Sequence, residues 1–286
     1  MVRGTEDKLF NTFIYIILGL VGLAAVVPLL YVVSVSLTPY GEVLRNGGYV
    51  LIPKAVTFQA YMKILSASDI WSSFRVTLFI TLVGTAISLI VTMLLAYPLS
   101  RKGLPYRKWF LFMIVLTLLF SGGIIPTYLI VKNTGLLDTV WALILPNAIW
   151  SFNVLIMKSF FENLPEELFE SARIDGAGEF RILWQLVVPL SMPSIITIGL
   201  FYAVGQWNQF FQAIMYVTDR TLFPLQVVVR EMLMLSQQAM ENSENMVPTV
   251  TMQMSAVVVA SLPIILVYPF LQKHLTKGML LGSIKG

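Results

Sequence analysis

The sequence predicts an all-α protein that crosses a membrane several times. Of its 286 residues, 57% are hydrophobic and only 12% are charged, whereas about a quarter of the residues in a soluble globular protein are charged. Six stretches are apolar over the roughly 20 residues that a helix needs to cross a bilayer. This composition excludes a nucleic-acid-binding module, a disordered tail and an ordinary cytosolic enzyme.

The six expected transmembrane helices cover residues 12–37, 76–99, 109–131, 140–160, 189–217 and 250–271. The first has an apolar core longer than the roughly 7–15 residues of a signal peptide, so we expect it to remain in the mature protein. No charged residue lies in the middle of a span, although carriers driven by protons or sodium usually need one there. Together the spans predict a single transmembrane domain over residues 1–286.

The basic residues predict the orientation of the chain. The short connection between the second and third spans contains Arg101, Lys102, Arg107 and Lys108 and no acid, whereas the connection after the third span contains only Lys132. Basic residues gather in the cytoplasmic loops of membrane proteins. We therefore expect the even-numbered loops and both termini to face the cytoplasm.

Several kinds of chemistry are missing from the chain. It contains no cysteine and one histidine, which excludes thiol catalysis, disulfide bonds and thiolate or histidine metal clusters. It also lacks the sequence G-x-x-x-x-G-K-[ST], which binds the phosphates of ATP. We therefore expect no catalytic residue, no metal site and no cofactor bound by this chain.

Residues 161–189, which follow the fourth span, have the pattern of two short helices. Pro165 and the acids after it suit the first turn of a helix, and Gly176 and Gly178 predict a stop and a sharp turn. A second helix is expected to end at Pro189 and carries four apolar residues at helical spacing: Phe180, Leu183, Trp184 and Val187. The residues alone leave open an interfacial helix that anchors the bundle and a docking surface for another protein.

This connection also carries a spaced motif. Residues 170–176 read Glu-Ser-Ala-Arg-Ile-Asp-Gly, and nine residues later residues 186–189 read Leu-Val-Val-Pro. The segment resembles the EAA loop of ABC-importer permeases, where Glu-Ala-Ala, three residues and Gly precede a similar ending. Ser171 replaces the first Ala of that motif.

The resemblance extends along most of the chain. Residues 96–101 resemble the AY-x-LSR stretch of these permeases, and residues 153–161 resemble a run that begins with Asn and ends with Phe-Phe. Residues 206–208 resemble their WN signature, and residues 277–286 resemble a GxxxGxxKG tail. Together these segments are similar to the carbohydrate branch, in particular to the maltose-type second permease and to relatives that import oligosaccharides and polysaccharide fragments.

The resemblance implies a type I ABC-importer permease: six transmembrane helices and a cytoplasmic coupling helix in the EAA loop, 161–189, in the bacterial cytoplasmic (inner) membrane. It implies four partners besides membrane lipid and no nucleic acid: a second homologous permease, a dimeric P-loop ATPase that binds ATP and Mg²⁺, an extracytoplasmic solute-binding protein, and an oligosaccharide. The external connection 218–249, between spans five and six, would meet the binding protein or rest on the bundle as a lid.

The resemblance also implies which residues contact the ATPase, namely Glu170, Ala172, Asp175 and Gly176. The pattern of the residues leaves the two acids open as part of a solvated helix face. Gly176 suits a turn packed against a partner, because glycine has no side chain.

Uncharged polar and aromatic residues within the spans form a candidate substrate path: Gln206, Trp207, Asn208, Gln209 and, in the fourth span, Asn153. Helical spacing places Gln206 and Gln209 on one face and Asn208 on another. Alternatively, these polar side chains form hydrogen bonds between helices and do not contact a substrate. These side chains would also suit a peptide or another polar solute, while a self-contained secondary carrier is disfavoured by the missing intramembrane charge.

Overall fold

The structure is a computed structural model that describes residues 5–239 and 249–283, with side chains described over 10–234 and 249–267. Parts of the expected external loop and of the tail, residues 240–248 and 284–286, lie outside the described residues. Every regular element in the described part is a helix. The chain divides into two compact units, residues 1–70 with 229–262 and residues 71–228 with 263–286. A single domain over the whole chain stays a prediction.

The first unit contains α1 (Thr5–Leu37), α2 (Tyr40–Arg45), α3 (Gln59–Ser66) and parts of α14 (Leu225–Ala239) and α15 (Val250–Ser283). The end of α1 is joined to α15 by two hydrogen bonds between side chains and carbonyl groups. Thr251 Oγ1 donates to the carbonyl of Thr38 at 3.1 Å, and Ser255 Oγ donates to that of Ser36 at 3.1 Å. These bonds satisfy polar groups where the two apolar helices meet.

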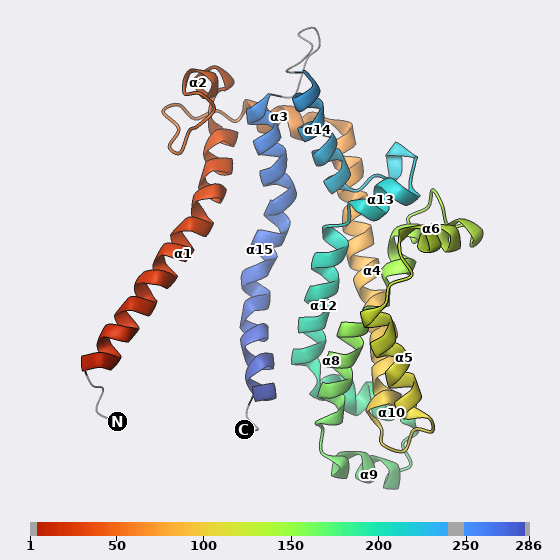
Figure 1. The fold of residues 1–286 in the computed structure, drawn as a ribbon. Helices are drawn as coiled ribbons and strands as arrows, with labels where there is room; N and C mark the ends of the chain where they lie inside the picture. Colours follow the sequence, from red (N-terminus) through yellow and green to blue (C-terminus); the bar gives the residue numbers. More distant parts are fainter. Residues whose placement is uncertain (1–4, 240–248, 284–286) are drawn as a thin grey trace. The chain divides into compact units, whose positions relative to one another are not determined.

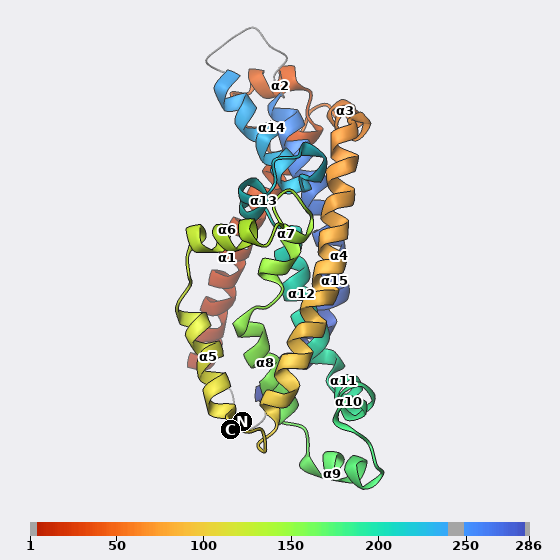
Figure 2. The same ribbon diagram turned by 90° about the vertical axis from the view of Figure 1, so that its right-hand side faces the viewer.

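The second unit is built around α4 (Ser68–Ser100), which is unbroken over 33 residues. The other α-helices that lie wholly within this unit are α5 (Arg107–Leu119), α6 (Ile124–Asn133), α7 (Trp141–Ile144), α8 (Ser151–Glu162), α9 (Glu166–Ile174), α10 (Glu179–Ile182), α11 (Val188–Leu190), α12 (Met192–Trp207) and α13 (Phe211–Tyr216). In this unit α9 lies beyond the ends of α4, α5 and α8, at the end opposite to α6 and α13 (Figures 1 and 2).

Three helices are by themselves long and apolar enough to cross a membrane, at 10–37, 68–100 and 250–267, and the number rises to six if each bent pair counts as one span. The bent pairs are α5 with α6 at 114°, Trp141–Asn147 with Ser151–Glu162 at 53°, and Glu179–Leu190 with Met192–Trp207 at 86°. Each of the expected spans 109–131, 140–160 and 189–217 therefore contains a sharp bend between two helices.

Glycine and proline explain two of these breaks. Gly123, between α5 and α6, has a φ of 87°, a conformation that is open to glycine but costly for other residues. Pro146 lies in the 3-10 helix Leu145–Asn147 between α7 and α8, and proline cannot donate the hydrogen bond that continues an α-helix.

Pro189 does not end the helix that precedes it, contrary to the prediction from the sequence. The helix passes through a π-helical turn, Leu183–Val187, and continues as α11 to Leu190 before it bends at Ser191. A proline ring normally collides with the carbonyl group four residues earlier. That carbonyl belongs to Gln185, which lies within the wider π turn, so the helix accommodates the ring.

A buried apolar cluster joins α4, α8, α9, α10 and α12 at the α9 end of the second unit. Its members include Tyr97, Met157, Phe161, Phe169, Leu183, Val187 and Tyr202. Since removing these side chains from water favours the packed arrangement, the cluster holds α9 against the ends of the longer helices.

Candidate functional site

The helix α9 has one buried face and one exposed face. It follows Pro165, carries acids at its first turn and buries Phe169 completely in the cluster that joins it to α8. On the outer face Ile174 is 86% exposed. Of the predicted coupling residues, Glu170 and Asp175 are exposed, while Ala172 is half-buried and packs against the core.

Gly176, the fourth predicted coupling residue, ends α9 through its backbone. Its φ is 77°, and its N–H donates to the carbonyl of Arg173 at 3.0 Å while that of Ala177 donates to the carbonyl of Ala172 at 2.9 Å. This pair of bonds is the Schellman arrangement, which favours glycine at the left-handed position. A Cβ at Gly176 would meet nothing within 4 Å, so within this chain the backbone conformation, and not a close contact, requires glycine.

Arg101, directly after α4, contacts both α8 and α9. Its guanidinium carbon lies 3.5 Å from the centre of the Phe169 ring, and Nη2 donates to the carbonyl of Phe161 at 3.1 Å. Nη1 lies 3.5 Å from Oε2 of Glu166. Burial lowers the pKa of Arg101 and the charge of Glu166 opposes this shift, but a guanidinium remains charged at neutral pH.

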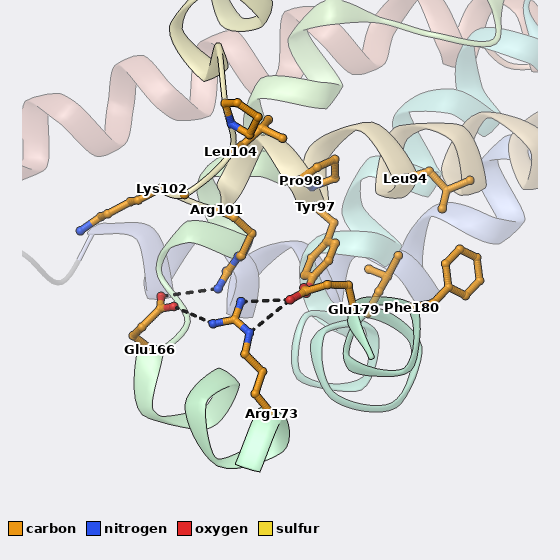
Figure 3. Close-up of a pocket in the computed structure, with 13 residues that line it drawn as sticks. Leu94, Tyr97, Pro98, Arg101, Lys102, Leu104, Glu166, Arg173, Glu179 and Phe180 are labelled. Atoms are coloured by element: carbon orange, nitrogen blue, oxygen red, sulfur yellow. Dashed lines mark hydrogen bonds and ion pairs between the residues drawn. The ribbon is translucent and has the colours of Figure 1, made fainter. Parts of the chain in front are cut away.

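A second arginine connects the two ends of the α9–α10 segment. Nη2 of Arg173 lies 3.1 Å from Oε1 of Glu179, and Nη1 lies 4.0 Å from Oε1 of Glu166. The hydroxyl of Tyr97 in α4 donates to Oε2 of Glu179. Figure 3 shows these side chains converging from α4, α9 and α10. Charged hydrogen bonds of this kind are stronger than neutral ones, so α9 is attached to the bundle through its side chains as well as through its core.

A further ion group supports the neighbouring helix ends. Arg107 donates from Nε to the carbonyl of Leu99 at 2.7 Å and from Nη2 to Oε1 of Glu162 at 2.6 Å. Lys158 pairs with the same carboxylate, one turn earlier in α8. The sequence predicts Arg107 only as a marker of orientation, because the pattern of charges does not show which acid it meets.

A pocket of about 740 Å³ opens beside this ion network. Residues of α4, the α4–α5 connection and the α9–α10 segment line it (Figure 3): Leu94, Tyr97, Pro98, Arg101, Lys102, Gly103, Leu104, Pro105, Glu166, Arg173, Glu179, Phe180 and Leu183. Its wall combines charged groups with exposed apolar side chains.

The predicted substrate-path residues of the fifth span are mostly buried. Nε2 of Gln209 donates to the carbonyl of Leu143 at 2.8 Å and to Oε1 of Gln206. A Cβ on Gly84 would lie 2.9 Å from the side chain of Gln206, so α4 passes directly against this pair. Because α12 ends at Trp207, the chain turn after the helix, and not the helical spacing predicted from the sequence, brings the two glutamines together.

The remaining candidates lie in different surroundings. Trp207 is buried, with its ring centre 6.1 Å from that of Phe74 in an edge-to-face arrangement. Asn208 is exposed, and its Nδ2 donates back to the carbonyl of Val204 at 2.9 Å. Asn153 is completely buried in α8, and neither atom of its amide has a hydrogen-bond partner among the described residues. In this conformation only Asn208 faces solvent or lipid.

Tyr202 in α12 supports the break before α8 and is absent from the candidates predicted from the sequence. Its hydroxyl lies 2.7 Å from Oγ1 of Thr92 and accepts a hydrogen bond from the backbone N–H of Trp150 at 3.1 Å. A Cβ on Gly205 would lie 2.4 Å from the Trp150 ring. No sequence pattern distinguishes Tyr202 from an ordinary core aromatic residue.

Comparison with known proteins identifies the group to which this architecture belongs. Residues 64–281 match the family of binding-protein-dependent transport system inner membrane components. The chain belongs to this family. The resemblance to importer permeases predicted from the EAA-like loop is thereby confirmed.

The most similar relatives include two proteins of Bacillus subtilis (strain 168). The protein LplC is 45% identical over 98% of this chain and 96% of its own length, and the polygalacturonan/rhamnogalacturonan transport system permease protein YtcP is 44% identical over 98% and 100%. Among solved structures, a chain of a bacterial ABC transporter for import of the acidic polysaccharide alginate superposes with a TM-score of 0.86 at 31% identity, covering 96% of this chain and 99% of that one. The all-α importer permease fold is confirmed.

Proposed function

We propose that this chain is a permease subunit of an ATP-driven, binding-protein-dependent importer of oligosaccharides, and that it forms half of the translocation pathway. The observation that carries the proposal is α9: a short helix with an exposed outer face, whose inner face is joined to α4, α8 and α10 by a buried core and a charged network. A helix held in this way can pass a displacement at its outer face to the ends of the transmembrane helices.

The outer face of α9 supports contact with a dimeric P-loop ATPase, which would bind ATP and Mg²⁺. Glu170, Asp175 and Gly176 are exposed at this end of α9, and Ile174 is an exposed apolar side chain beside them. Such a side chain suits a pocket on a partner better than it suits water. Ala172 would act by fitting α9 against the core.

The names of the relatives support a carbohydrate as the solute. One relative is a permease for polygalacturonan and rhamnogalacturonan, and another, AraQ of Halalkalibacterium halodurans, which is 25% identical over 92% of this chain, is a permease for arabinooligosaccharides. A second solved chain, from an alginate transporter in complex with a periplasmic protein that holds an alginate pentasaccharide, is 14% identical with a TM-score of 0.58 and supports the fold alone. A peptide or another polar solute remains the alternative within this transporter class.

We also propose an orientation of the chain in the membrane and the proteins that it contacts. The end that carries α9 would face the cytoplasm together with both termini, and the connection 218–249 would meet an extracytoplasmic solute-binding protein. A second homologous permease would complete the pathway in the cytoplasmic membrane. The side chains of α1 suit contact with lipid or another membrane subunit, because large apolar residues such as Phe13, Leu20 and Leu23 are exposed on it.

Within the pathway we place Gln206, Trp207, Gln209 and Asn153, with Asn208 at the margin. In the present conformation Gln206 and Gln209 bond to each other. When the pathway opens, the hydroxyl groups of a sugar would replace that bond, and the face of Trp207 would pack against the sugar ring.

The test is purification of this chain from its native membrane in mild detergent, with mass spectrometry of the proteins that remain bound. We expect a second permease and a P-loop ATPase in constant proportion to the chain. A homo-oligomer without any ATPase would overturn the proposal in favour of a self-contained carrier.

A further inference from the structure

The pocket between the end of α4 and the α9–α10 segment is lined by both charged and apolar side chains, and coupling to an ATPase does not explain this combination. It has a volume of about 740 Å³ and lies between the end of α4 and the α9–α10 segment. We propose that this pocket binds a membrane phospholipid, with the phosphate of the headgroup beside Lys102 and an acyl chain along Leu94 and Phe180. The proposal goes beyond the proposed transport function and does not depend on the identity of the solute.

The charged groups of the wall leave a positive excess. Three cations, Arg101, Lys102 and Arg173, face two acids, Glu166 and Glu179, so the excess is one positive charge. The two arginines pair with the acids, whereas Lys102 is exposed and makes no hydrogen bond or ion pair with any residue that the structure describes. Lys102 is therefore the cation that is free to meet a phosphate.

Arg101 strengthens the positive potential of the same wall. Its Nη1 is buried and has no hydrogen-bond partner among the described residues, since Glu166 lies 3.5 Å away, outside the normal length for such a bond. A negative group in the pocket would therefore be attracted by Lys102 and by an incompletely neutralised arginine together.

The apolar part of the wall distinguishes a lipid from a free phosphate. Leu94, in the apolar stretch of α4, is 39% exposed, and Phe180 is 68% exposed. Trp184, which is 38% exposed, lies beside Phe180 with the ring centres 6.5 Å apart. Exposed aromatic residues next to basic ones are typical of the boundary between the hydrocarbon and the headgroups of a bilayer.

The position of Leu94 favours a lipid over a segment of a soluble partner. This residue lies about one and a half turns inside α4, whose 33 residues form an unbroken candidate span. A protein outside the bilayer would not reach into the apolar part of a span, whereas phospholipid surrounds it. The same molecule would touch the wall that carries Arg173 and Glu166 of α9.

The experiment uses the full chain with the subunits that purify with it, stripped of lipid by detergent exchange and examined by native mass spectrometry. Three probes separate the contributions: dioleoylphosphatidylglycerol, dioleoylglycerol without the phosphate, and inorganic phosphate without the acyl chains. We expect one tightly retained phosphatidylglycerol, and no comparable retention of dioleoylglycerol or displacement by inorganic phosphate.

Two variants test the pocket. Lys102→Glu should weaken phosphatidylglycerol retention about tenfold or more, because a basic residue at an anionic headgroup is replaced by a repelling charge. The matched control is Lys108→Glu, which makes the same change of charge in the first turn of α5, outside the pocket. Phe180→Ser should weaken retention through the apolar wall, and Phe152→Ser on α8, also an exposed position, should not.

Three results would overturn the inference. Equal retention by the Lys102→Glu and Lys108→Glu proteins would show that the bound lipid lies elsewhere. Equal retention of dioleoylglycerol, or displacement of the lipid by inorganic phosphate at the same concentration, would remove the role of a phospholipid. Loss of the lipid whenever the ATPase is bound would assign the pocket to that protein instead.

Discussion

At the scale of single residues, Arg101 makes the largest number of different contacts at the site. It combines a ring contact with Phe169, a hydrogen bond to the carbonyl of Phe161 and an ion pair with Glu166. The planar guanidinium group makes all three at once, which the ammonium group of a lysine cannot reproduce.

We therefore expect Arg101→Lys to lower the stability of the chain by about 1–3 kcal/mol, because the ring contact and the charged hydrogen bond are both weakened. In the assembled transporter this variant should also lower the ratio of substrate-stimulated to basal ATPase activity. Thermal unfolding in detergent and ATPase assays in vesicles measure the two effects. Lys108→Ala is the control, and equal behaviour of the two variants would contradict the role given to Arg101.

Two different constraints could require glycine at position 176, the end of α9: its backbone conformation, or close contact with a docked partner. Its backbone has a φ of 77°, while a side chain would find open space within this chain. Asparagine tolerates this conformation better than β-branched residues do.

If the backbone alone requires glycine, Gly176→Val should cost about 1–2 kcal/mol and impair coupling, while Gly176→Asn should behave almost as the wild type. If a docked partner fills the open space, both variants should lose the ATPase on purification. Co-purification of the ATPase together with thermal unfolding separates the cases, and unchanged transport by both variants would remove Gly176 from the coupling site.

At the scale of elements, the two faces of α9 have different roles. Phe169 is completely buried, whereas Ile174 is 86% exposed in the same helix. If the outer face docks the ATPase as proposed, substitutions at the two positions should have separable effects on stability and on docking.

Ile174→Glu should leave the unfolding temperature unchanged and reduce the amount of ATPase that co-purifies with the chain. Phe169→Ala should instead destabilise the chain by about 3–5 kcal/mol, because it leaves a cavity in the core. Quantitative co-purification and thermal unfolding of both proteins test this division. Normal ATPase recovery with Ile174→Glu would exclude the outer face of α9 as the docking surface.

At the opposite end of the second unit, Asp138 joins two connections. Its carboxylate accepts hydrogen bonds from Oγ1 of Thr218 at 2.8 Å and from the N–H of Asp219 at 3.2 Å. Hydrogen bonds from Thr218 and Asp219 lower the pKa of Asp138. A lowered pKa means that folding stabilises the charged form, so this stabilisation is complete above the ordinary pKa of an aspartate, about 3.9, and is lost as the pH falls further.

The variant Asp138→Asn should therefore unfold at a lower temperature than the wild type at pH 7, and the difference should shrink as the pH falls below about 4. Unfolding temperatures of both proteins across the pH range test the prediction. A difference that is independent of pH would show that the charge of Asp138 is not responsible.

At the scale of the whole molecule, three unbroken helices of the described part are long and apolar enough to cross a membrane, and three bent pairs make up the other candidate spans. Breaks in transmembrane helices are tolerated where neighbouring protein groups satisfy the backbone. Around the break before α8, Tyr202 supplies such a group to the N–H of Trp150. Gln206 lies in the last turn of α12 and Gln209 lies directly after the helix.

We expect Gln206→Ala to reduce substrate-stimulated ATPase activity of the assembled transporter more than basal activity, because the sugar contacts proposed for Gln206 would form only in the working cycle. Gln253→Ala, which removes another buried amide from α15, is the control. Assays with and without the binding protein and an oligosaccharide give the two rates. An equal loss of both would favour a packing role for Gln206.

The sequence alone determined the class of the protein and the existence of α9. Composition and the length of the apolar stretches require a polytopic helical membrane protein, since an apolar span cannot be left in water. The turn signals of Pro165 and Gly176 are local, so the bounds of α9 follow from the chemistry of neighbouring residues. Family membership followed from a spaced motif in the same segment.

Only the tertiary structure decided which side chains meet. The pairing of Arg101 with Phe169, of Tyr97 with Glu179 and of Gln209 with Leu143 joins residues between 66 and 82 positions apart. Such contacts depend on how the helices pack against one another, which no local pattern encodes. The same holds for the pocket beside Lys102, because segments that are distant in the chain line it.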